Sequence, residues 1–190
     1  MSGPITLMIL ERQQKTHRRL LEIVHDLSET QLNWRPDSYA PSIGFHLWHM
    51  ARWADRLQAT LPAMTIAPAG PTGTTFEIWE IDGLARRWEW PAALLGYGQT
   101  GMEMSDEMVV DLKLPHKHVL MDYAREAFAA ADRAVSVLED YQLEERGIDI
   151  YGQENTVGYV LLVHLSHASR HLGMIECLRG VQGLRGTATV

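Results

Sequence analysis

The chain has 190 residues, enough for one domain with a sizeable core, and its 46% apolar and 22% charged residues are ordinary for a globular protein. A net charge of −7, with no Lys/Arg cluster longer than Arg86-Arg87, argues against a protein that binds nucleic acid through its phosphates. Because Cys177 is the single cysteine and no apolar run approaches about 18 residues, we expect no internal disulfide and no membrane span.

The first expected element is a helix over residues 5–27, because inward residues recur there at helical spacing. They are Leu7, Leu10, Gln14, His17, Leu21 and Val24. The sequence before this helix has no basic region and too short an apolar run for a signal peptide, which together with the single cysteine favours a cytoplasmic protein. Residues 28–41 are expected to form a connection in which Trp34 either covers the core or lines a pocket.

A second long helix is expected from its N-cap Ser42 to about Leu61, directly before Pro62. One face carries apolar residues together with three aromatic side chains that point towards the core, namely His46, His49 and Trp53.

The charged residues of this helix fall mostly on its other faces and are interpreted as solvated charges or local ion pairs. They are Arg52, Asp55 and Arg56. For Asp55 a second interpretation stays open, in which its carboxylate orients one of the histidines.

The segment 62–115 is expected to be an elaborated crossover, too short and irregular to be a domain. It begins with a loop over residues 62–75, continues with a short helix that is broken near Gly83, and ends with a short helix capped by Ser105.

Two further long helices are predicted, over residues 116–138 and from a cap at Asn155 or Thr156 to Gly180, with a loop over residues 140–154 between them. No strand-like alternation persists in the chain. The sequence therefore predicts a single all-α domain over residues 1–190, a four-helix bundle with the crossover between its second and third long helices.

The last long helix carries His164, His167 and His171 within roughly 60° of one another on the face that also holds its apolar residues. Buried imidazoles need partners, because an unpaired polar nitrogen costs free energy in the core. One explanation is hydrogen bonding to buried groups, and the other is a shared divalent metal ion, which the spacing of His167 and His171 permits.

Histidines on two helices can meet inside the bundle, and the expected metal ligands are His49, His167 and His171. Three neutral imidazoles suit zinc, nickel or iron and leave a coordination position open. His46 and His164 rank second, as alternative ligands or pocket residues. Other chemistries fit less well, because the sequence lacks a G-x-S-x-G elbow, a phosphate loop and a CxxC motif, and Cys177 is interpreted as an inert buried thiol.

The segments SIGFHLWHMARWADR and HLSHASRHLGMIECLRG resemble the two signature helices of the DinB-like superfamily, which includes YfiT-type and thiol-dependent S-transferase proteins. The segments DGLARRWEWP and GYGQTGMEMSDEMV resemble the crossover of one of its subgroups. The resemblance implies a four-helix bundle, often a homodimer, whose divalent metal is held by residues that match His49, His167 and His171. Met174 stands where the family often has Gln.

The resemblance also implies low-molecular-weight thiols, such as bacillithiol or mycothiol, as co-substrates of characterised relatives. We therefore expect a metal-dependent enzyme that activates a small thiol or water for transfer, isomerisation or hydrolysis of a small molecule. Trp48, Trp53 and Met174 are expected near its pocket. The alternatives are a non-catalytic metal-binding or stress-associated bundle, and histidines that are ordinary core residues.

Overall fold

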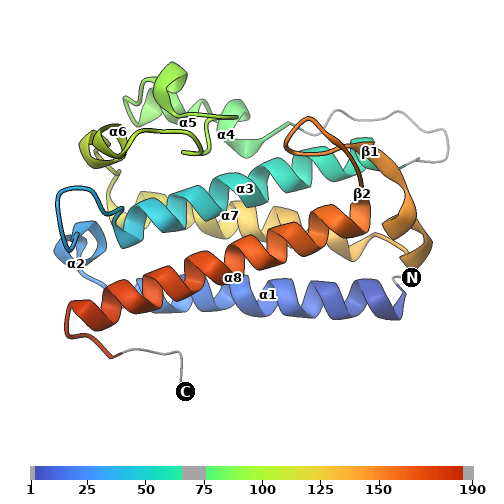
Figure 1. The fold of residues 1–190 in the computed structure, drawn as a ribbon, viewed down its shortest axis with the longest axis horizontal. Coiled ribbons are helices and arrows are strands. Elements are labelled where there is room, and N and C mark those ends of the chain that lie inside the picture. Colours follow the sequence, from blue (N-terminus) through green and yellow to red (C-terminus); the bar gives the residue numbers. More distant parts are fainter. Residues whose placement is uncertain (1–2, 66–75, 186–190) are drawn as a thin grey trace.

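Four long helices lie side by side in the computed structural model, which describes residues 3–65 and 76–185 (Figure 1). They are α1 (Pro4–His25), α3 (Ile43–Met64), α7 (Lys117–Ser136) and α8 (Val157–Val181). In Figure 1, α3 and α7 run in the same direction, and the segment between them returns along the length of α3. The predicted bundle with an elaborated crossover is therefore confirmed. The loop predicted over residues 62–75 lies largely outside the described residues.

The two helices that carry the candidate ligands begin at the predicted caps. The Ser42 hydroxyl accepts a hydrogen bond from the backbone N–H of Phe45 at the start of α3. Thr156 does the same for Tyr159 at the start of α8. Each cap pairs a backbone donor that has no partner within its own helix, so both helices have fixed starting points.

The core lies mainly between α3 and α7, which pack closely against each other. Buried alanines on both helices permit this close approach, because a methyl group keeps the backbones near each other. They include Ala51 and Ala54 on α3 and Ala124, Ala127 and Ala131 on α7. Every residue of α3 from Ile43 to Asp55, charged residues included, is buried.

The crossover consists of short pieces joined by turns: α4 (Ile78–Ile81), α5 (Leu84–Arg87), the 3-10 helix η1 (Ala92–Leu94) and α6 (Asp106–Asp111). The predicted break at Gly83 is confirmed, since Gly83 has a left-handed backbone with φ of 58° between α4 and α5. The predicted cap of the last piece is confirmed as well, because the Ser105 hydroxyl accepts from the N–H of Met108.

Three local predictions were wrong. The connection after α1 contains α2 (Glu29–Asn33), which begins with a capping box between Ser28 and Gln31. Pro62 lies inside the last turn of α3 instead of following it, although its ring nitrogen has no N–H to donate to the preceding turn. The loop over residues 140–154 contains a 3-10 helix and a small antiparallel hairpin. These are η2 (Asp140–Glu144), β1 (Arg146–Ile148) and β2 (Glu154–Thr156).

The buried stripe of α1 is rotated from the predicted one, since Leu7 and Gln14 are exposed whereas Gln13 and Leu20 are buried. Arg52 and Asp55 are not solvated, because both side chains are almost fully buried, but they do form the local ion pair that was the other possibility. Asp55 bonds to the backbone of the crossover and to Tyr123 rather than to a histidine. The crossover packs on these charges and supplies several of their hydrogen-bond partners, among them the carbonyl of Gln99 and the N–H of Ile78. None of the helices within residues 3–65 and 76–185 is both long and apolar enough to cross a bilayer.

Candidate metal centre

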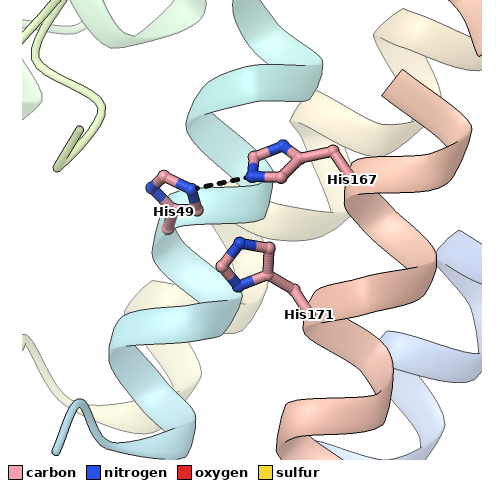
Figure 2. A group of neighbouring side chains, drawn as sticks. All are labelled: His49, His167 and His171. Carbon is pink, nitrogen blue, oxygen red and sulfur yellow. Dashed lines mark hydrogen bonds between the residues drawn. The ribbon is translucent and has the colours of Figure 1, made fainter. Parts of the chain in front are cut away.

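One histidine of α3 faces two histidines of α8 across the interface between these helices (Figure 2). His49, His167 and His171 each offer one ring nitrogen, and the three nitrogens lie within 4.8 Å of one another. The Nε2 atoms of His49 and His167 are 3.2 Å apart. His167 and His171 are one helical turn apart, so both rings leave α8 on the same side. The predicted triad therefore comes together in space.

Two of the three rings make a hydrogen bond through the ring nitrogen that faces away from the triad. Nδ1 of His49 donates to the backbone carbonyl of Thr100 at 2.6 Å, which makes Nε2 the nitrogen that carries the lone pair. Nδ1 of His171 lies 2.9 Å from Nδ1 of His46, and Figure 2 shows the other ring nitrogen of His171 directed towards His49 and His167. Such outer contacts fix the tautomer and orientation of a metal-ligating imidazole.

The indole of Trp53 closes one side of the triad. Its Nε1–H donates to Nε2 of His49 at 3.2 Å, and its ring also contacts the ring of His167. Trp53 is buried, and the ring of Tyr151 packs against it with centroids 5.0 Å apart. A donor therefore points at the lone pair that a metal ion would use, so this N–H needs another acceptor whenever an ion is bound.

Burial keeps all three imidazoles neutral at physiological pH. It lowers the pKa of His49 from 6.5 to about 4, that of His167 to about 3 and that of His171 to about 2, with neighbouring imidazoles adding to the effect for His167 and His171. A neutral imidazole is the form that binds a metal. Three convergent, neutral nitrogens without a carboxylate among them fit zinc or another divalent ion that accepts nitrogen ligands.

The chain is similar to known proteins in sequence pattern and in fold. The family model of the DinB superfamily matches residues 13–175. The chain belongs to the DinB superfamily. A crystal structure described as the conserved protein of locus from Enterococcus faecalis has the same fold, with a TM-score of 0.73, 17% identity, and coverage of 94% of this chain and 96% of that chain. No curated protein sequence matches the chain.

The second-choice residues of this DinB protein occupy separate places. His46 touches the triad only through His171. His164 points away towards α1, where its Nε2 lies 3.4 Å from Nε2 of His17. Trp53 contacts the triad as predicted, whereas Trp48 is buried in a cluster with Trp79 and Trp90 beneath the crossover.

Two predictions near the C-terminal end of α8 also need comment. Cys177 is exposed, so its interpretation as a buried thiol was wrong. It lies six residues beyond His171, nearly two turns, where α8 presents this side to the outside of the bundle. Met174 is 40% exposed, and the side chain contributes no polar atom to the site.

The contribution of the crossover was not foreseen. No function was predicted for residues 96–101, yet the carbonyl of Thr100 accepts a hydrogen bond from a histidine that lies about fifty positions earlier in the DinB chain. A backbone carbonyl carries no side-chain signature. The nearby glycines, Gly96, Gly98 and Gly101, were the one available sign that this backbone passes close to another element.

Proposed function

We propose that the protein is a metal-dependent enzyme of the DinB superfamily, in which His49, His167 and His171 hold a divalent ion such as zinc, nickel or iron. The ion would act as a Lewis acid that lowers the pKa of a small thiol or of water, for transfer, isomerisation or hydrolysis of a small molecule. As the family resemblance implies, we further propose a cytoplasmic homodimer with a low-molecular-weight thiol as co-substrate.

The observation that carries this proposal is the convergence of three neutral imidazole nitrogens within 4.8 Å of one another. Within the described part of the chain no other group of three or more histidine, cysteine or acidic side chains has this geometry. His46 meets His171 on the nitrogen that faces away from the triad, so it supports a ligand without completing a fourth position. Three protein ligands with one open position are typical of catalytic zinc sites.

The residues around the triad have defined tasks in this proposal. Thr100 and His46 hold the outer nitrogens of two ligands, which directs the inner nitrogens to one point. The indole N–H of Trp53 is the buried donor nearest to that point, and it would donate to an anionic group of the substrate or thiol. The burial of Trp53 also excludes water from this side of the site.

The proposal is tested by elemental analysis of the purified protein, followed by titration of the metal-free protein with cobalt as a spectroscopic substitute for zinc. We expect one ion per chain and an absorption spectrum of a nitrogen-ligated, four-coordinate ion. A screen of small thiols with electrophilic acceptors then identifies the reaction class. A protein that binds less than a tenth of an equivalent of any divalent ion would contradict the assignment.

The burial of His49, which is only 7% exposed, supports a second candidate, a non-catalytic bundle in which the ion stabilises the fold. The two functions differ in coordination number. X-ray absorption of the zinc-loaded protein should give three imidazoles and one exchangeable ligand for the enzyme. Four protein ligands, with His46 recruited as the fourth, would favour the structural bundle.

A further inference from the structure

The turn over residues 96–101 brings the crossover backbone against the ligand-bearing face of α3. Three of its glycines have left-handed backbones, with φ of 69° at Gly96, 55° at Gly98 and 89° at Gly101. A Cβ atom at Gly101 would lie 2.8 Å from Trp48 and 2.9 Å from Phe45, so only glycine permits this approach. The turn is therefore built to place the carbonyl of Thr100 beside the ring of His49.

A buried arginine of α3 holds the two residues that precede Thr100. The Nε atom of Arg52 donates to the carbonyl of Gln99 at 2.9 Å, and Nη2 donates to the carbonyl of Gly98 at 2.9 Å. Gln99 itself has a left-handed backbone with φ of 53°, a strained conformation for a residue that is not glycine. The two hydrogen bonds from a planar guanidinium stabilise this turn in one geometry.

The guanidinium is in turn fixed by its remaining donors. Nη1 donates to Asp55 and to the hydroxyl of Tyr123, both at 3.2 Å, and Nη2 pairs with Glu77. Arg52 is 1% exposed, so its charge depends on these two carboxylates and cannot turn outwards to water. One buried network thus joins α3, α7 and the crossover directly behind the triad.

We propose that Arg52 is a positioning residue for metal binding, which acts by holding the Thr100 carbonyl that fixes the tautomer of His49. The proposal rests on the proposed function, since it assigns Nε2 of His49 to the ion. With the carbonyl in place, the proton of His49 stays on Nδ1, and the Nε2 lone pair points into the triad, where it accepts the indole N–H of Trp53 as long as no ion is bound. Without it the proton can move to Nε2, where it occupies the ligand position.

The test replaces Arg52 by Lys, which keeps the charge but cannot donate to both carbonyls as a planar fork. In the metal-free protein we expect the nitrogen-15 shifts of His49 to change from a single Nδ1–H tautomer to a mixture. Zinc affinity, measured by competition with a chromophoric chelator, should fall by about 10- to 100-fold. The matched control is R35K, because Arg35 also donates to a crossover carbonyl, that of Val110, but does not bind the turn.

A second pair of variants keeps the proposal testable should R52K not fold, as judged by its thermal transition. The Thr100 hydroxyl donates to the carbonyl of Tyr97 at 2.7 Å and accepts from the N–H of Met102. T100A loosens the turn from within and should shift the tautomer of His49 and weaken zinc binding, whereas T100S, which keeps the hydroxyl, should restore most of both.

The proposal is overturned if folded R52K and T100A retain the wild-type nitrogen shifts and zinc affinity, or if R35K loses as much affinity as R52K. Failure of the proposed function gives a different result. In that case the wild-type protein binds no zinc, while the tautomer of His49 in the metal-free protein still responds to R52K and T100A.

Discussion

Two histidine clusters lie side by side in the bundle, and they differ in what completes them. In the triad, His49 and His167 face each other with their Nε2 atoms 3.2 Å apart. In the neighbouring cluster, His17 and His164 face each other in the same way, with their Nε2 atoms 3.4 Å apart. Both pairs join α8 to another helix, so spacing alone does not distinguish them.

The difference is a carboxylate. Oδ1 of Asp132 lies 2.9 Å from Nδ1 of His17 and accepts a hydrogen bond from Gln13 at 2.9 Å, and the ring of Phe128 stacks on His17. Ring N–H groups alone can therefore satisfy the hydrogen bonds that run from Asp132 through His17 to His164. Among residues 3–65 and 76–185 no carboxylate belongs to the triad, where three nitrogens converge instead, the arrangement on which the proposed metal site depends. An inward histidine therefore indicates either a hydrogen-bonded cluster with a carboxylate or a group of converging imidazoles.

The largest expected effect is the loss of zinc affinity when one of the proposed ligands is removed. We expect His49→Ala and His167→Ala to lose more than 100-fold in zinc affinity, beyond the range found for outer contacts, because each deletes one of three bonds to the ion. His17→Ala is the matched control, because it also removes the partner of a histidine of α8, in this case His164. The His17→Ala variant should keep full metal content. Metal analysis after gel filtration measures both. Equal losses in the two clusters would contradict the distinction.

Acid should be the next largest perturbation of the metal-free triad. In the unfolded chain these imidazoles take up protons near pH 6.5, whereas burial lowers the pKa of His49 to about 4 in the folded protein. The unfolded state therefore binds more protons between these values, and the free energy of unfolding falls as the pH decreases through this window. For His49 alone the loss is about 3 kcal/mol.

Urea unfolding in the presence of a chelator, at pH 7.5, 6 and 5, measures this dependence. The variant His49→Phe should show a shallower decrease over the same range, because it removes one of the protonation sites. A wild-type free energy of unfolding that stays constant from pH 7.5 to 5 would contradict the prediction.

The four long helices could be predicted from the sequence because they depend on local periodicity, which also puts the three histidines of the triad on inward faces. The meeting of His49 with His167 and His171 depends on the packing of α3 against α8, which periodicity does not describe. The helical spacing of His167 and His171 relative to Val160 and Ile175 already places the rings inside. The burial of Arg52 and Asp55 could not be predicted from the sequence, because it depends on a crossover that covers α3 from a distant part of the chain. Periodicity describes one helix and says nothing about a loop that packs on its outer face.

The separation of His164 from the triad could not be predicted either, because it also depends on packing between distant parts of the chain. Whether an inward histidine joins the triad or another cluster depends on the residue opposite it, which for His164 is His17 of α1, and the partner of His17, Asp132, belongs to α7. In the sequence, Asp132 does not differ from the other charged residues of α7. Contacts between helices, rather than the pattern within one, decide between the two solutions.

A smaller effect is expected from Asp132→Ala, which breaks the second cluster without touching the first. His17 would lose the acceptor of its Nδ1–H while its ring stays buried, and Gln13 would lose its partner as well. We expect a loss of about 1.5–3 kcal/mol in the free energy of unfolding, with zinc affinity unchanged. Urea unfolding of the metal-free protein and zinc competition measure the two quantities. A variant with wild-type stability but weakened zinc binding would show that the clusters act as one.

The smallest effect should follow from His46→Phe, which removes the outer contact of His171 but keeps an aromatic ring in its place. His171 would still present its inner nitrogen, because α8 sets the direction of the ring, but the ring could rotate more freely. We expect zinc affinity to fall about tenfold, the lower end of the range for outer contacts and about 1.4 kcal/mol. His46→Asn offers His171 a new hydrogen-bond partner and should recover part of the loss. If H46F instead abolishes zinc binding, His46 is itself a ligand, and the triad is a closed site of four histidines rather than an open one of three.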